Sequence, residues 1–105
     1  MDAPISAKAA LLQALIRGPG YGLDLIERVK KQTKGALVLG TGSVYPALRS
    51  LEAEGLLETY EGEASLDRGN LPRIYYRLTA KGARVATENK NTVAGLFGLT
   101  VRGAT

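Results

Sequence analysis

The chain has 105 residues, 45% of them hydrophobic and 23% charged, which is enough for one globular domain and too short for two. It contains no cysteine and no histidine, so disulfide scaffolds, zinc fingers, iron–sulfur clusters and Ser-His or Cys-His catalytic pairs are all excluded. The net charge of +4 favours a binding protein with a polyanionic partner, and we expect neither a cofactor nor a metal ion.

Charge is distributed unevenly along the chain. Residues 1–35 carry six basic and three acidic side chains. Residues 36–63 carry one basic and five acidic side chains, and residues 64–105 carry seven basic and two acidic side chains. These basic flanks around an acidic middle are either solvated faces or part of a surface for a polyanion. The sequence has no apolar run of about 18 residues and no basic segment ahead of an apolar stretch near Met1. We therefore expect a cytoplasmic protein without a secretory signal or a transmembrane helix.

The first two predicted elements are helices joined by a short turn. In residues 6–17 alanine and leucine recur at helical spacing, and Ser6 stands where it can cap the first turn. Residues 21–34 predict a second amphipathic helix, which Gly35 can end. The intervening residues 18–20, GPG, break the first helix, and this short connection suits a helix-turn-helix or any other helical hairpin.

A loop over residues 36–42 precedes a third predicted helix over residues 43–54. Val44, Leu48 and Leu51 recur at i, i+4 and i+7, so we expect these three side chains to face the core. This spacing leaves the remaining faces of the helix to solvent or to a partner.

The N-terminal half of this third helix carries the candidate DNA-binding residues. We expect Thr41 or Ser43 to cap its start and Pro46 to lie in or near the first turn. Helix-turn-helix proteins contact bases with this part of the third helix, and the carboxylates here come only later in the sequence. The alternative is an ordinary surface helix in which Tyr45 packs on the second helix. The outward side chains are small, hydroxyl-bearing or basic: Thr41, Gly42, Ser43, Tyr45, Pro46 and Arg49.

Two strands and a fourth helix complete the predicted order. Residues 56–63 and 73–78 alternate apolar and polar side chains, which is typical of strands. The segment 64–72 between them is rich in turn-forming residues, so we expect a β-hairpin with a long loop. Thr79 is placed to cap a fourth helix that runs to about Gly95.

Three helices, a hairpin and a further helix are the element order of a winged helix-turn-helix. The predicted fold class is therefore α+β, mainly α, with a two-stranded wing and a C-terminal dimerisation helix. We assign residues 1–78 to the DNA-binding domain and residues 79–105 to the dimerisation helix and tail. Arg68 and Arg73 flank the hairpin tip, where an arginine can enter a minor groove or pair with a phosphate. Charged side chains at a hairpin tip can also serve only to keep the turn soluble. Both interpretations, a DNA contact and a solvated turn, therefore stay open.

The C-terminal segment predicts a homodimer. An apolar stripe runs through the fourth helix into the last residues, and exposed apolar patches usually mark partner surfaces. We expect the dimer to form through this stripe, with help from the first helix. The alternative is that the tail folds back on its own core. The members of the stripe are Val85, Val93, Leu96, Phe97, Leu99 and Val101.

Three motifs occur in order over about residues 9–85. They are a GPxYGxxL turn in ALIRGPGYGLDLIERV, a YPALxxLExxGL helix in GSVYPALRSLEAEGLLE, and a PRxYYxLTxxG run in PRIYYRLTAKG. One such motif alone is weak, whereas the three together are specific. Together they resemble the PadR family of bacterial and archaeal transcriptional regulators, in its short form with one C-terminal helix.

The resemblance implies a homodimeric winged-helix protein that binds DNA and is usually a repressor relieved by a small-molecule effector. It implies that the third helix enters the major groove with Tyr45 and Arg49. It also implies that Tyr21 contacts a phosphate and that Arg73 stands at the base of the wing. Some relatives stack planar drugs between tryptophans of the dimer, and a chain without tryptophan cannot bind an effector in that way.

The main functional prediction is a sequence-specific repressor that binds an inverted-repeat operator and is not an enzyme. The first alternative is a winged-helix module that binds another protein, since the acidic segment 52–63 would suit a basic partner. The second alternative is a small carboxylate-dependent hydrolase, which needs two converging carboxylates. Glu58 and Glu61 are the nearest candidates in sequence, but they fall on opposite faces of a short strand.

Overall fold

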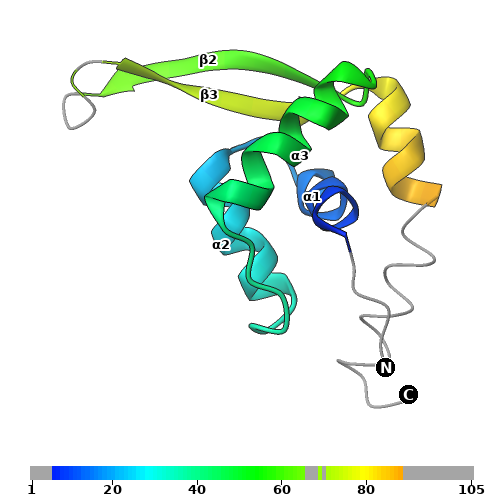
Figure 1. The fold of residues 1–105 in the computed structure, drawn as a ribbon. Helices are drawn as coiled ribbons and strands as arrows, with labels where there is room; N and C mark the ends of the chain where they lie inside the picture. The colour runs from blue at the N-terminus through cyan, green and yellow to red at the C-terminus, as the bar shows by residue number, and fades with distance from the viewer. Residues whose placement is uncertain (1–5, 66–68, 70, 89–105) are drawn as a thin grey trace.

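A computed structural model of the chain describes residues 6–65, 69 and 71–88. Figure 1 shows three helices gathered beneath a long β-hairpin, which projects beyond them on one side, while a fourth helix lies on the other side. This arrangement confirms the predicted fold class, α+β and mainly α, of a winged helix-turn-helix. The elements in chain order are α1 (Ala7–Ile16), β1 (Gly20–Tyr21), α2 (Gly22–Gln32), α3 (Thr41–Ala53), β2 (Leu57–Ser65), β3 (Leu71–Leu78) and a C-terminal helix over residues 80–88.

The first two helices lie close to their predicted positions. Ser6 caps α1 as predicted, because its hydroxyl accepts a hydrogen bond from the amide three residues on, at 3.1 Å. The second helix is shorter than predicted: α2 begins at Gly22, since Tyr21 has an extended backbone and belongs to β1. The helix ends at Gln32 with Thr33 as its C-cap, so Gly35 is not the predicted C-cap. Gly35 lies two residues later, with a left-handed φ of 83° and an amide that donates to the Lys30 carbonyl at 2.8 Å.

The core lies where α1, α2 and α3 meet beneath the sheet. The prediction that Val44, Leu48 and Leu51 face the core is confirmed, since all three side chains are completely buried. Leu11 of α1 and Leu25 of α2 are equally buried and belong to the same cluster. Burying a side chain of this size contributes roughly 1.5–3 kcal/mol, so one face of α3 is held firmly to the other helices. Its opposite face is left to solvent.

The start of α3 differs from the prediction. The helix begins at Thr41 with Gly40 as its N-cap and without a side-chain cap, so neither Thr41 nor Ser43 has the predicted capping role. The Gly40 carbonyl instead accepts the first hydrogen bonds, from the Ser43 and Val44 amides at 3.0 and 2.9 Å. Pro46 is the sixth residue of the helix and lies in its second turn. Its side chain is exposed, so water can reach the carbonyl that Pro46 leaves without a backbone donor.

The sheet has one strand more than the predicted two-stranded wing. The strands lie in the order β1-β3-β2 and are antiparallel. The additional strand β1 pairs with Tyr75 and Tyr76 of β3, and its two residues are too few to show the alternation that reveals a strand in sequence. β2 and β3 also extend into the segment 64–72 that was predicted as loop, with an irregularity in the pairing between Glu61 and Ala64.

The C-terminal helix starts against the end of α3. Thr79 caps it as predicted, because its hydroxyl oxygen accepts a hydrogen bond from the Gly82 amide at 3.0 Å. The Thr79 amide donates to the Leu56 carbonyl at 3.0 Å, and the Thr79 hydroxyl donates to the Gly55 carbonyl at 2.6 Å. One residue therefore caps the new helix and binds the turn that follows α3.

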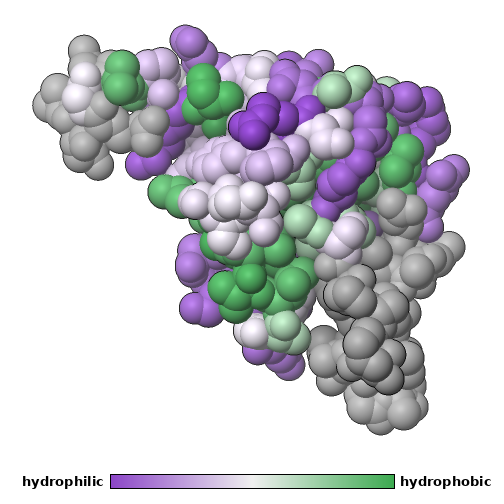
Figure 2. Space-filling model, in the orientation of Figure 1, coloured by the Kyte–Doolittle hydropathy of each residue, from purple (hydrophilic) through white to green (hydrophobic). Residues whose placement is uncertain are grey.

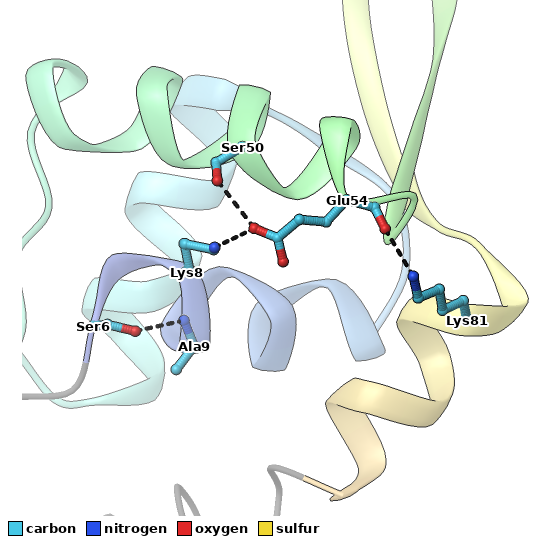
Figure 3. A network of polar contacts seen from close by, with 6 residues as sticks. All are labelled: Ser6, Lys8, Ala9, Ser50, Glu54 and Lys81. Atoms are coloured by element: carbon cyan, nitrogen blue, oxygen red, sulfur yellow. Dashed lines mark hydrogen bonds and ion pairs between the residues drawn. The ribbon is translucent and has the colours of Figure 1, made fainter.

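Two further contacts tighten this arrangement. The Lys81 ammonium donates to the Glu54 carbonyl at 3.1 Å (Figure 3). Gly82 lies so close to the turn that a Cβ atom on it would stand 1.9 Å from the Leu56 carbonyl oxygen. We call these contacts between residues 54–56 and residues 79–82 the α3 junction.

The predicted dimerisation stripe is described only at its beginning. Val85 is half-buried and packs against the core cluster of its own chain. The predicted continuation of the helix to Gly95 lies outside the described residues, as do the other members of the stripe: Val93, Leu96, Phe97, Leu99 and Val101. The division into residues 1–78 and 79–105 stays a prediction. Within the part of the chain that the structure describes, no helix has the length and apolar character needed to cross a membrane.

Candidate nucleic-acid interface

The N-terminal half of α3 presents an exposed surface made of small, hydroxyl-bearing and basic groups. Figure 2 shows pale and hydrophilic surface over α3, while hydrophobic surface gathers over the loop between α2 and α3. Hydroxyls and a guanidinium are suited to phosphate oxygens and base edges, so this surface is the candidate interface. We call it the α3 surface, and its members are Thr41, Ser43, Pro46 and Arg49.

One carboxylate near the end of α3 is engaged elsewhere. Glu54 forms an ion pair with Lys8 of α1 and accepts a hydrogen bond from the Ser50 hydroxyl at 3.1 Å (Figure 3). The hydrogen bond from Lys8 and then that from Ser50 hold the pKa of Glu54 below its ordinary value. The negative charge of Glu54 is thus paired with a lysine.

The turn between α1 and α2 is held by Arg28. Its guanidinium donates hydrogen bonds to the carbonyls of Ala14, Gly18 and Pro19, at 3.0, 2.8 and 3.0 Å. It also forms an ion pair with Asp24, one turn earlier in α2, at 2.9 Å. Arg28 therefore satisfies backbone oxygens at the end of one helix and in the connection to the next. Sequence reasoning missed this role, although the Asp24–Arg28 spacing of i, i+4 was visible.

Three tyrosines cross the outer face of the sheet, which is the face turned away from the helices. Tyr75 stacks on Tyr60, with ring centroids 5.5 Å apart and planes at 15°, and meets Tyr21 edge-on at 5.6 Å and 80°. The Arg73 guanidinium lies 4.4 Å from the Tyr21 ring centroid, and that of Arg77 lies 5.0 Å from the Tyr60 ring centroid. We call these five side chains, which connect β1, β3 and β2, the tyrosine ladder.

The sheet separates two groups of predicted DNA-binding residues. Side chains alternate along β3, so Arg73 points to the outer face, whereas Tyr76 and Leu78 pack towards the helices. Tyr21 and Arg73 therefore lie together, each in contact with the other, on the opposite side of the sheet from α3. Their roles at the DNA backbone and the wing stay predictions, and Arg68 lies outside the described residues.

Tyr45 behaves differently from its neighbours on α3. It is half-buried and packs against the core cluster. Its hydroxyl oxygen lies where Gly22 of α2 would otherwise carry a side chain: a Cβ atom on Gly22 would be 2.2 Å away. The alternative considered from sequence, in which Tyr45 packs on the second helix, describes this contact.

Tyr76 of β3 lies near the same part of α3. Burial raises the pKa of Tyr76 above its ordinary value, and Tyr45 and Glu52 raise it further, while Arg49 lowers it. Tyr76 packs against the core cluster from the inner face of the sheet, where these α3 side chains influence its charge. Tyr76 was not among the predicted site residues, because the alternation of side chains along a strand does not indicate which helix its buried face packs against.

The described residues include no group of three or more Asp or Glu side chains that could hold a metal ion, and the chain has no histidine or cysteine.

The comparisons with known proteins agree with this geometry. The sequence model of the transcriptional regulator PadR-like family matches residues 11–88. A transcriptional regulator from Clostridium thermocellum superposes with a TM-score of 0.69 at 25% identity, over 91% of this chain and 89% of that one. A PadR family transcriptional regulator from Eggerthella lenta gives a TM-score of 0.62 at 31% identity, over 84% and 72% of the two chains. Bacillus subtilis PadR in complex with operator DNA has the same fold, with a TM-score of 0.66 at 23% identity, over 77% of this chain and 44% of that one. No curated protein sequence matches the chain.

Proposed function

Because the chain belongs to the PadR-like family of transcriptional regulators, we propose that it represses transcription by binding an inverted-repeat operator in double-stranded DNA as a homodimer. Members of this family are regulators and not enzymes, which removes the hydrolase alternative. The protein acts in the cytoplasm, and a small-molecule effector relieves repression. Since the chain has no tryptophan, this effector is held by groups other than stacked indoles.

The observation that carries the proposal is the α3 surface. Arg49 is the ninth residue of α3 and is exposed, and its guanidinium can donate two hydrogen bonds to a guanine edge or to a phosphate. Thr41 and Ser43 bring hydroxyls to the first turn, where phosphate contacts position a helix on DNA. The Bacillus subtilis relative, which has the same fold, is in complex with operator DNA, and this supports DNA as the partner.

The salt dependence of DNA binding tests the proposal directly. A dimer that neutralises six or more phosphates should lose affinity with salt at a slope of about −5 or steeper in log affinity against log salt. We expect this slope in fluorescence anisotropy with an operator selected from genomic fragments, and a weaker affinity for a scrambled duplex. A protein that ignores both DNA and heparin at low salt would instead support the alternative of a protein-interaction module.

The homodimer is proposed on the C-terminal apolar stripe. Several of its side chains are large, and burial of each contributes roughly 1.5–3 kcal/mol, so a few are sufficient to hold two chains together. A chain that ends at Asn91 loses Val93, Leu96, Phe97 and Leu99 and keeps Val85. We expect this shortened chain to sediment as a monomer and the full chain as a dimer. A dimer of the shortened chain would contradict the assignment of the interface.

A further inference from the structure

We propose that Tyr45 is a positioning residue for DNA binding: its ring, seated on Gly22, fixes where α3 lies on α2 and so where Arg49 stands, and does not itself touch DNA. This inference rests on the proposed function of the α3 surface. It assigns Gly22 a role as well, because only glycine leaves room for the ring.

The contact between Gly22 and Tyr45 is unusually close. A Cβ atom on Gly22 would lie 2.2 Å from the Tyr45 hydroxyl oxygen, 2.5 Å from Cζ and 2.6 Å from Cε1. Figure 1 shows the N-terminal half of α3 lying beside α2. Gly22 is itself buried, so the ring tip fills the space at the first turn of α2. The two helices are therefore in contact through a bare backbone on one side and an aromatic ring on the other.

The backbone gives no other reason for glycine at this position. The glycines with a left-handed φ among the described residues are Gly18, Gly35, Gly55 and Gly69, and Gly22 is not one of them. Alanine is a better helix former than glycine by about 1 kcal/mol, so the first turn of α2 would accept it readily. The three atoms nearest to an added Cβ all belong to Tyr45. The space that glycine leaves is thus used by this ring.

The position of Tyr45 determines the position of Arg49. The two residues are four apart on one rigid helix, so they share its orientation. Arg49 is exposed, so its side chain can reach a ligand. Tyr45 is half-buried, so its side chain supports the helix from the inner side. A hydrogen bond to a base weakens steeply beyond about 3.2 Å, so a small displacement of α3 removes it.

A double-mutant cycle between Gly22→Ala and Arg49→Ala tests this inference. The added Cβ meets the far end of a flexible side chain, so we expect Gly22→Ala to fold and to displace the ring. Its operator affinity should fall about tenfold, a change in the range measured for residues that act through a shared contact. Arg49→Ala should then cause little further loss in the Gly22→Ala background, because α3 no longer presents Arg49 correctly. Fully additive losses would overturn the inference.

Three further variants keep the test decisive. Tyr45→Phe retains the ring and removes the hydroxyl, so it should bind the operator as the wild type does; a clear loss would mean that the hydroxyl contacts DNA. If Gly22→Ala does not fold, the cycle is repeated with Tyr45→Ala and Arg49→Ala, where non-additive losses support positioning. Leu23→Ala, an exposed neighbour in α2, is the control and should leave affinity unchanged. Failure of the wild type to bind any operator would overturn the proposed function, whereas additivity in a protein that binds would overturn only the role of Tyr45.

Discussion

Replacement of Gly82 by alanine should destabilise the fold by about 2–4 kcal/mol. The added Cβ would stand 1.9 Å from the Leu56 carbonyl oxygen, 2.9 Å from its carbonyl carbon and 3.2 Å from its Cα. These atoms belong to backbone, which cannot turn aside as a side chain can. The C-terminal helix must therefore move away from the end of α3, and the hydrogen bonds of Thr79 in the α3 junction must lengthen. Equilibrium unfolding in urea measures the loss as a lower midpoint.

A second glycine provides the matched control for this substitution. Gly42 lies within α3 and is exposed, and nothing lies within 4 Å of a Cβ on it. Gly42→Ala should therefore stabilise the protein by about 0.5–1 kcal/mol, through helix propensity and the lower entropy of the unfolded chain. If the two variants unfold at the same urea concentration, the close packing at Gly82 does not have the importance that we assign to it.

Replacement of Arg49 by alanine should reduce operator affinity by about 1–3 kcal/mol for each half-site, if Arg49 contacts a base. The side chain is exposed on α3, so the free energy of unfolding should change by no more than about 0.5 kcal/mol. Specificity should relax at one position of each half-site, and affinity for a scrambled duplex should change less than affinity for the operator. Fluorescence anisotropy with both duplexes, and circular dichroism for the fold, give these quantities.

Arg84 offers a control with the same loss of charge. It is exposed on the C-terminal helix, which Figure 1 shows at the opposite end of the molecule from the start of α3. Arg84→Ala should therefore leave the preference for operator over scrambled duplex unchanged. An unchanged operator affinity for Arg49→Ala, in a folded protein, would mean that α3 does not contact the bases.

The periodic features of this fold were predictable from sequence because they depend on residues that are close in the chain. The i, i+4, i+7 spacing of Val44, Leu48 and Leu51 identified the buried face of α3, and all three side chains are buried. Ser6 and Thr79 cap their helices through amides three residues on, which is also a local pattern.

The features that sequence did not reveal depend on contacts between distant residues. Strand β1 exists because two residues after a turn happen to meet β3, more than fifty positions later. The α3 cap could not be predicted because Thr41 and Ser43 both suit the role, and Gly40 is the N-cap instead. The exposed α3 surface followed from the buried face opposite to it, but the burial of Tyr45 depended on the absence of a side chain at Gly22.

The α3 junction joins the proposed DNA-binding helix to the proposed dimerisation segment without a flexible link. The carbonyls of Glu54, Gly55 and Leu56, which follow the last turn of α3, all accept hydrogen bonds from Thr79 or Lys81. Bending at this point would break several of these hydrogen bonds together. We therefore expect α3 and the start of the C-terminal helix to move as one rigid body. In a dimer built on the C-terminal segment, the angle between the two C-terminal helices would then set the distance between the two α3 helices. That distance must match half-sites about 34 Å apart. A change of a few degrees in the angle between the C-terminal helices, far from the DNA, would therefore be enough to prevent both α3 helices from reaching their half-sites together.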